Sequence, residues 1–353
     1  MPDWTKTMQQ TFEYYVVDPG TWKDAKRLSN VISSTINRDA ETETLGSLTL
    51  DVAELIGECY VRIYLVTIQN DIKEKIPLGT YLIQTPSYDF DGKVKSVKLD
   101  AYTPLMELKE KRPPIGYSLL ENENIMERAY QIARDNLRAP VFRVENSEVL
   151  HFDFVSNTND SWVTFLSDLI SNAKYSLGLD ELGKVIFMPI QDTASLQPVW
   201  RYNDDNSSIL QPKVEMSQDL YGIPNVVEVI YSSNKNYFYS KVVNDDPNSP
   251  ISTVNRGREI SYREMNPTSI GNPSQEQLDE YAKRLLRSLS SLEYRVTYTH
   301  AYCPVRIGDC VMLNYARAGL NNVKAKVVSQ KIECRPGCPV TETVVFTNRL
   351  WGD

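Results

Sequence analysis

Hydrophobic residues along this 353-residue chain recur with two spacings, one typical of strands and the other of helices. In residues 274–290 the spacing is three or four positions, at Leu278, Tyr281, Leu285, Leu286 and Leu289. This pattern predicts an amphipathic helix, whose hydrophobic face packs either on its own domain or in a groove of a partner protein. Ser274 stands three positions before Gln277, so we expect a capping box at the first turn.

Strands are predicted throughout residues 1–105. Apolar and polar residues alternate in the segments 45–52 and 60–68, as they do when one face of a strand is buried. Asp91-Gly92 separates two further segments of this kind, and this dipeptide is typical of a tight hairpin turn. Short strands at such spacing favour an antiparallel β-barrel that is closed or nearly closed.

Residues 106–197 differ from the segment before them because they contain two helical patterns. The first covers residues 124–137, and the second covers residues 161–173, where Asp160 or Asn159 can cap the helix. A short hairpin follows the second helix. We therefore expect a small α+β domain inserted into an otherwise β-rich chain.

Strand patterns return after this domain. Residues 198–301 predict a second β-barrel that includes the 274–290 helix, and residues 302–353 predict a separate small β-domain. The expected fold class is therefore α+β and β-rich, with two antiparallel β-barrels, an inserted α+β domain and a small C-terminal β-domain. No sequence repeat relates residues 1–105 to residues 198–301.

The composition is that of an ordinary soluble globular protein, with 41% hydrophobic and 24% charged residues. The formal net charge of −8 gives no electrostatic reason to expect sequence-specific nucleic-acid binding. No apolar run approaches the roughly 20 residues of a membrane helix, so we expect no membrane insertion. The N-terminal segment MPDWTKTMQQ has neither a basic stretch nor an apolar core, so we predict folding in a reducing cytosol without a signal peptide.

Four segments, taken in order, resemble parts of one protein family. They are IPLGTYLIQTPSYDF at 76–90, SWVTFLSDLISNAKYSLGLDELGKVIFMPI at 161–190, WRYNDDNSSIL at 200–210, and the run from NVVEVIY at 225 to VTYTHAYCPVRIGDCVML ending at 313. Together they resemble the baseplate or tail-tip hub proteins of tailed bacteriophages. The resemblance rests on the order of the segments, since each alone is a pattern of apolar and turn residues.

This resemblance implies a homotrimer in which each chain supplies two tail-tube-like barrels, so that three chains form a ring of six. One face would receive the tail tube or its initiator protein, and the other would hold the central spike or tip. Tape measure protein, surrounding baseplate proteins and genomic DNA in the channel are the further partners. The resemblance thus implies a structural virion protein of the tail baseplate, assembled in the host cytoplasm. The hub of a bacterial contractile injection system is an alternative with the same fold.

Four of the five cysteines flank two predicted turns, Cys303 and Cys310 the first, Cys334 and Cys338 the second. If the strands between the turns pair, both turns can lie at one end and bring four thiols together. Four thiolates suit a [4Fe-4S] cluster or a structural zinc ion, with His300 as a substitute ligand. Two such pairs also resemble the cluster-binding cysteines of some long-tailed phage hubs. Free or disulfide-paired cysteines are the alternative.

A cell-wall hydrolase is the enzymatic alternative, since two carboxylates on opposite sides of a cleft can cleave a glycoside. The carboxylate pairs in question are Asp51 with Glu54, Glu121 with Glu123, and Asp204 with Asp205. They lie beside turns or on polar faces, where solvation explains them. His151 precedes FDFV and suits a strand better than a general base. No nucleophile elbow, zinc-protease motif or phosphate-binding loop occurs in the sequence, so we expect no enzymatic activity.

Overall fold

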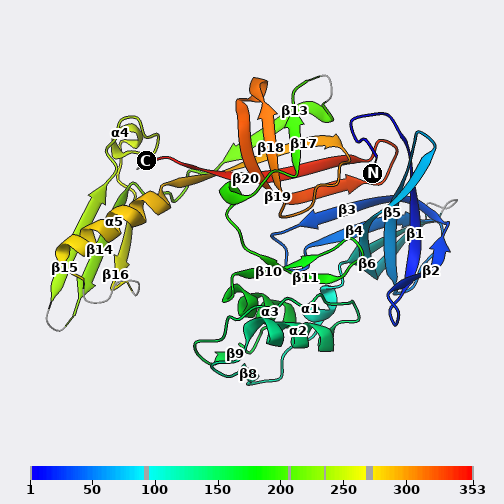
Figure 1. The fold of residues 1–353 in the computed structure, drawn as a ribbon, viewed down its shortest axis with the longest axis horizontal. Coiled ribbons are helices and arrows are strands. Elements are labelled where there is room, and N and C mark those ends of the chain that lie inside the picture. The colour runs from blue at the N-terminus through cyan, green and yellow to red at the C-terminus, as the bar shows by residue number, and fades with distance from the viewer. Residues whose placement is uncertain (1, 91–94, 206–207, 234–235, 268–272, 352–353) are drawn as a thin grey trace. The chain divides into compact units, whose positions relative to one another are not determined.

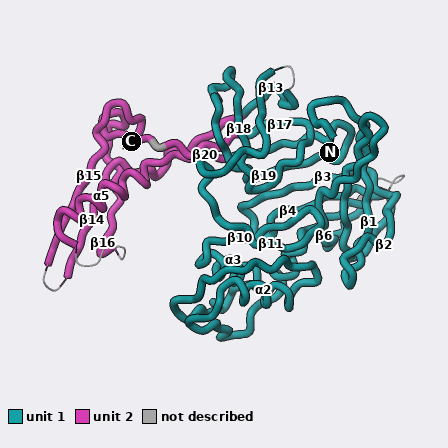
Figure 2. Tube along the Cα trace, viewed as in Figure 1, with its two compact units in different colours: residues 1–214, 297–344 teal, residues 215–296, 345–353 magenta. Residues whose placement is uncertain are grey.

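The computed structural model describes residues 2–90, 95–205, 208–233, 236–267 and 273–351. It contains two compact units, residues 1–214 with 297–344 and residues 215–296 with 345–353 (Figure 2). The boundary falls within three strands, β13 (Leu210–Gln218), β17 (Ser291–Ala301) and β20 (Pro339–Arg349). Both units are built on sheets with few helices, so the predicted β-rich α+β fold class is confirmed (Figure 1).

The N-terminal strands form one half of a large sheet, here called the first half. In sheet order they are β2 (Lys23–Leu28), β1 (Gln9–Asp18), β5 (Tyr60–Gln69), β6 (Ile72–Phe90), β7 (Lys95–Tyr102), β4 (Gly46–Val52) and β3 (Val31–Asp39). Burial alternates along β4, so one of its faces lies in the core. Asn70 and Asp71 join β5 to β6 with φ of 50° and 63°, the left-handed pair that a two-residue hairpin turn requires. The Asp91-Gly92 turn lies outside the described residues.

Helices and short strands follow the first half, in the region where an α+β domain was expected. They are α1 (Met106–Glu110), β8 (Ser118–Leu119), α2 (Ile125–Asn136), β9 (Phe154–Val155), α3 (Trp162–Ser171), β10 (Tyr175–Leu179), β11 (Val185–Pro189) and the 3-10 turn η1 (Thr193–Ser195). Asn124 caps α2 and Ser161 caps α3, each accepting a backbone N–H, so neither Asp160 nor Asn159 is the cap. The two helices and the β10–β11 hairpin share one hydrophobic core.

The C-terminal strands form the second half of the same sheet. They are β13, β17, β20, β19 (Leu320–Glu333), β18 (Cys310–Tyr315) and β12 (Trp200–Asn203), with the 3-10 turn η2 (Ala316–Ala318) after β18. Because β19 is 14 residues long, it pairs with β18 near its start and with β3 near its end. Residues 302–353 are therefore not a separate small β-domain, since β18, β19 and β20 complete the second half. A pattern of period two predicts a strand but not the strand that pairs with it. The sequence therefore predicts a domain boundary at residue 302 that the structure does not have.

The second unit contains a three-stranded sheet covered by a helix. The sheet order is β15 (Tyr237–Val243), β14 (Val226–Ser232) and β16 (Ser261–Met265), and the helices are α4 (Thr253–Arg256) and α5 (Gln275–Leu289). The predicted capping box starts α5, where Ser274 Oγ accepts the Gln277 N–H at 3.3 Å and Gln277 Oε1 accepts the Ser274 N–H at 2.9 Å. The core of this unit consists of Val227, Val229, Leu278, Ala282 and Leu286, so α5 packs on its own sheet. Among the described residues, no helix combines the length and hydrophobicity needed to cross a membrane.

The two halves of the large sheet repeat the same order of strands. Across the sheet, the strands of the first half have the order β3-β4-β7-β6-β5-β1, and those of the second half have the order β13-β17-β20-β19-β18-β12. Matching strands also come in the same order along the chain, with β14, β15, β16 and α5 inserted between β13 and β17. β2 has no counterpart, and β12 runs parallel to β18 whereas β1 runs antiparallel to β5. The chain thus contains a structural duplication that its sequence does not display.

Candidate functional site

The two halves of the sheet meet where β3 pairs antiparallel with β19, a junction here called the seam. Residues 35–39 of β3 lie opposite residues 329–333 of β19. Arg38 crosses the seam, because its Nη1 donates to Gln330 Oε1 of β19 at 3.0 Å; its Nη2 donates to the Leu78 carbonyl of β6, in its own half, at 2.7 Å. A backbone ladder and a charged side chain therefore fix how two repeated halves adjoin.

Gln330 connects the seam to a buried polar cluster around Glu342 of β20. Its Nε2 donates to Glu342 Oε2 at 2.6 Å, while Tyr298 and Tyr202 donate to Glu342 Oε1 at 2.6 Å and 3.1 Å. His300 Nε2 lies 3.7 Å from Glu342 Oε2. These five residues are here called the Glu342 cluster. The side chains of Glu342 and His300 are 0% exposed.

The ionisation of the cluster follows from this packing. Burial alone would raise the pKa of Glu342, but His300, Tyr298 and Gln330 hold that pKa below its usual value by hydrogen bonding and, for His300, by charge. Burial alone would lower the pKa of His300, but the Cys303 thiol and the Glu342 carboxylate raise it to about 10. At neutral pH the cluster therefore contains an imidazolium paired with a carboxylate.

The Glu342 cluster is a structural element rather than a reaction centre. Because His300 and Glu342 are fully buried, a substrate cannot reach either of them unless the core opens. Its members come from β12, β17, β19 and β20, so the cluster holds four strands of the second half in register. The sequence predicts His300 only as a substitute metal ligand. The one signal for Glu342 is its place between Val340 and Val344, on the inward face of a strand.

The four cysteines predicted to share a metal lie in separate places. Cys303 lies beside the Glu342 cluster, with its Sγ 3.4 Å from Tyr202 Oη. Cys310 is the first residue of β18, whereas Cys334 and Cys338 flank the turn between β19 and β20. All the cysteines of the chain are free thiols.

The pairing of β18 with β19 separates Cys310 from Cys334. Cys310 lies opposite Lys326, and the eight residues from there to Cys334 span roughly 26 Å at about 3.3 Å per residue. Cys310 therefore lies beside the middle of β19, whereas Cys334 and Cys338 lie beyond its C-terminal end. In the described parts of the chain, no three His, Cys, Asp or Glu side chains are grouped so that they could hold a metal ion. The residues present do not fit a four-thiolate iron–sulfur or zinc site.

Burial also lowers the reactivity of these thiols. It raises the pKa of Cys310, of Cys338 and of Cys334, the last to about 12. We expect a thiol-reactive dye to label at most the partly exposed Cys59 in the native protein and all five cysteines after unfolding in guanidinium. EDTA should change neither count. Labelling that increases only after chelation would instead indicate a metal bound by these thiols.

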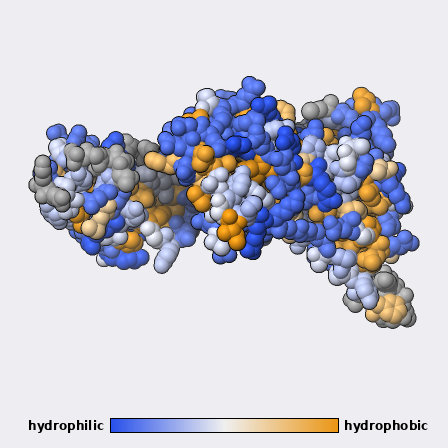
Figure 3. All heavy atoms as spheres, turned by 90° about the horizontal axis from the view of Figure 1, so that it is seen from below, coloured by the Kyte–Doolittle hydropathy of each residue, from blue (hydrophilic) through white to orange (hydrophobic). Residues whose placement is uncertain are grey.

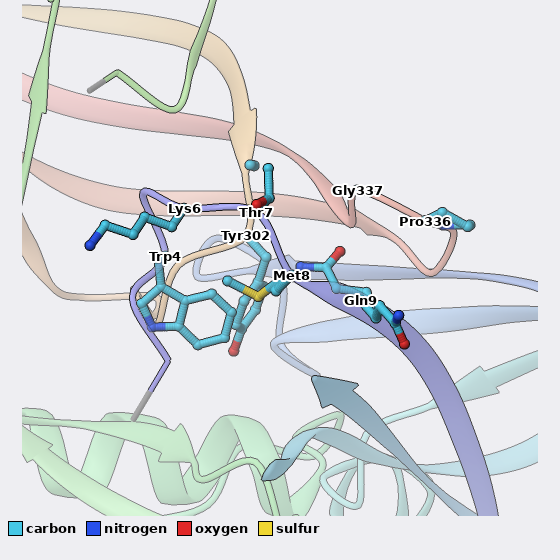
Figure 4. Close-up of a pocket in the computed structure, with 10 residues that line it drawn as sticks. Trp4, Lys6, Thr7, Met8, Gln9, Tyr302, Pro336 and Gly337 are labelled. Carbon is cyan, nitrogen blue, oxygen red and sulfur yellow. The ribbon is translucent and has the colours of Figure 1, made fainter. Parts of the chain in front are cut away.

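A pocket of about 460 Å³ lies beside the N-terminal segment (Figure 4). Trp4 and Tyr302 contact each other edge to face in it, with ring centroids 5.1 Å apart. The remaining lining residues are Lys6, Thr7, Met8, Gln9, Gln10, Ala301, Pro336 and Gly337. Lys6 is the one charged residue of this lining, and it is paired with Asp3 at 3.2 Å. The pocket therefore offers no acid–base pair for catalysis.

Two of the carboxylates that could serve in glycoside hydrolysis, Asp204 and Glu123, contact arginines. Arg317 Nε donates to Asp204 Oδ2 at 2.7 Å. Burial alone would raise the pKa of Glu123, but the paired Arg128 holds it below its usual value, the opposite of what a general acid needs. His151 is exposed in a bend ahead of β9 rather than in a strand. Asp204 and Glu123 are therefore each paired with an arginine.

Exposed hydrophobic residues are scattered rather than concentrated. The face drawn in Figure 3 is mainly hydrophilic, with hydrophobic residues in separate patches. Strongly exposed examples are Ile115 at 96%, Tyr221 at 93% and Phe152 at 81%. Single exposed hydrophobic residues are normal on soluble proteins and do not mark a site.

No protein-family model and no curated protein sequence matches the chain. Solved structures share its fold over nearly the whole length, among them three tail proteins. The tail protein from Neisseria meningitidis MC58 is 11% identical, with a TM-score of 0.65 over 96% of each chain. The prophage MuSo2 43 kDa tail protein from Shewanella oneidensis is 10% identical, with a TM-score of 0.61 over 94% of this chain and 97% of that one. The prophage tail protein gp18 from Listeria monocytogenes EGD-e is 13% identical, with a TM-score of 0.51 over 96% and 95%.

Sequence identities this low establish a common fold and nothing finer. The chain has the fold of phage tail proteins, and the resemblance predicted from its sequence is confirmed at that level.

Proposed function

We propose that this chain is a non-enzymatic structural protein of a phage tail, a homotrimeric hub between a threefold spike and a sixfold tube. The observation that supports this proposal is the repeated strand order, with the two halves joined edge to edge at the seam (Figure 1). Three chains arranged head to tail would present six similar halves around one axis. The fold shared with phage tail proteins supports the location in the virion tail.

The two faces of such a ring have different partners. One face receives the tail tube or its initiator protein, and the other holds the central spike, with tape measure and baseplate proteins nearby. A net charge of −8 suits a channel that DNA crosses without binding. A bacterial contractile injection system would use the same ring, and the neighbouring genes distinguish it from a phage.

The mass of the purified protein in solution tests this proposal. Light scattering should give three times the chain mass of 40.4 kDa, and imaging should show six lobes around a central opening. A stable monomer, or a ring with another number of lobes, would overturn the proposal. Clearing of cell walls by the purified protein would contradict its non-enzymatic part.

A further inference from the structure

We propose that copies of this chain join by strand addition, with β13 of one copy pairing with the outer part of β6 of the next. The segments are residues 214–218 of β13 and residues 85–89 of β6. This inference rests on the trimer proposed above and names the surface that holds it together. The partner of each strand edge is a second copy of this chain.

The first argument is the equivalence of β13 and β3. Both strands are nine residues long, and each occupies the same end of the repeated order, beside β17 and β4 respectively. At the seam, β3 pairs through residues 35–39. When β3 and β13 are aligned from their first residues, Val31 and Leu210, the corresponding segment of β13 is residues 214–218. β13 is also the last strand of the sheet, so an added strand would extend the sheet there.

The second argument is the equivalence of β6 and β19. Both are long strands whose first part pairs with the preceding strand, up to Leu82 opposite Tyr60 and up to Lys326 opposite Cys310. Past that point, β19 presents the same edge to β3. The residues of β19 that pair with β3, residues 329–333, lie three to seven positions after Lys326. The residues three to seven positions after Leu82 are residues 85–89 of β6. The described β5–β6 ladder has ended there, so a strand from another copy can occupy this side of β6.

The two segments are exposed, as an edge open to a second copy requires, although Pro86 removes one backbone N–H from the proposed ladder. Residues 85–87 of β6 are exposed, and Met216 of β13 is 53% exposed. β2, the strand at the other end of the sheet, carries Lys23, Lys26 and Arg27, and such charges discourage pairing between sheet edges. β2 also lies outside the repeated order of strands. The proposed contact therefore uses the two edges that the repeat identifies.

Repetition of the seam between copies produces a ring. Within a chain, the first half uses β3 to bind β19 of the second half; between copies, the second half uses β13 to bind β6 of the next first half. Each half thus binds its two neighbours through different edges, so the interface between copies is head to tail. Such an interface forms a closed ring when the rotations that relate successive copies add up to a full turn. In a trimer, three seams within chains alternate with three equivalent contacts between chains.

Disulfide trapping tests the contact. The two alignments place Ser87 opposite Met216, and facing residues on paired strands have Cβ atoms about 4.5–5.5 Å apart, close enough for a disulfide after a small adjustment. A chain with Ser87→Cys and Met216→Cys, in a Cys59→Ser background, should form covalent trimers on oxidation. The matched control carries Lys26→Cys with Met216→Cys, and we expect it to form about tenfold less covalent trimer because those positions are not juxtaposed.

Mass measured under reducing conditions separates the two proposals. A trimer by mass that gives no more crosslinking than the control would overturn the strand pairing and leave the hub proposal intact. A monomer by mass would overturn both. Equal crosslinking of Ser87→Cys with cysteines at positions 215, 216 and 217 would also overturn it, because adjacent residues of a strand point to opposite faces.

Discussion

Replacement of Glu342 by alanine is expected to lower the free energy of unfolding by about 3–5 kcal/mol, because it leaves the His300 imidazolium buried without its partner charge. Tyr298, Tyr202 and Gln330 would lose a hydrogen-bond acceptor in the same step. Urea unfolding followed by circular dichroism measures this loss as an earlier transition.

Two variants serve as controls for this prediction. Glu342→Gln keeps an acceptor oxygen and a similar volume, so it should cost less than Glu342→Ala. Glu293→Ala removes a carboxylate from an exposed pair with Arg295 on β17, and it should change stability by no more than about 1 kcal/mol. Equal losses for Glu342→Ala and Glu293→Ala would show that the buried cluster does not stabilise the fold.

The same pair makes the effect depend on pH. The pKa of His300 is about 10 in the folded protein against 6.5 for the free side chain, so its contribution is complete below pH 6.5 and is lost as pH rises towards 10. The pKa of Glu342 is below its usual 4.5, so its contribution is present above pH 4.5 and is lost as pH falls through the lower folded value. The stability difference between the wild-type protein and Glu342→Ala should be largest from pH 4.5 to 6.5.

Phe165→Ala should destabilise the helical region after the first half by about 3–5 kcal/mol. Phe165 is 1% exposed, and its ring lies 5.0 Å from Phe154, 5.4 Å from Tyr117 and 5.7 Å from Trp162, measured between centroids. Alanine would leave a cavity that the packed helices α2 and α3 cannot fully close. Limited proteolysis should then cleave within residues 106–197 before it cleaves elsewhere.

Phe152→Ala is the matched control for this variant. Phe152 lies in the same region but is 81% exposed, so its loss should change stability by less than about 0.5 kcal/mol. Similar cleavage rates for the two variants would contradict the role assigned to the buried aromatic core.

Local features of the fold could be predicted because neighbouring residues determine them. The capping box of Ser274 and Gln277 depends on residues three positions apart, and it starts α5 as expected. The predicted caps of α3 are wrong by one or two positions, since Asn159, Asp160 and Ser161 are all capping residue types and Ser161 is the one that accepts the Thr164 N–H. Alternating burial along β4 likewise follows from its own sequence.

Features that depend on distant segments could not be predicted in the same way. An alternating strand shows that one face is buried, but it does not identify the neighbouring strand. The pairing of β3 with β19 and the repeated strand order therefore became visible only in the structure. The predicted boundary at residue 302 falls just before a turn, although the strands on both sides of it belong to one sheet.

The candidate site shows the same division. The sequence predicts a metal site because the cysteines flank turns, yet the pairing of β18 with β19 separates Cys310 from Cys334. The burial of Glu342 could not be predicted, because a carboxylate in a strand usually lies on the solvent-facing side. In the structure, four side chains surround it instead. The residues that form a turn are neighbours in the sequence, whereas the side chains that compensate a buried charge come from distant strands.

The seam between β3 and β19 has a consequence for biosynthesis. Arg38 and Gln330 are 292 residues apart, so at translation rates of roughly 5–20 residues per second β3 waits about 15–60 s for its partner strand to leave the ribosome. During that interval, β19 from a neighbouring nascent polypeptide on the same messenger RNA can take its place. We expect expression from slowly translated or crowded polysomes to give more strand-exchanged aggregates than dilute refolding of the complete chain.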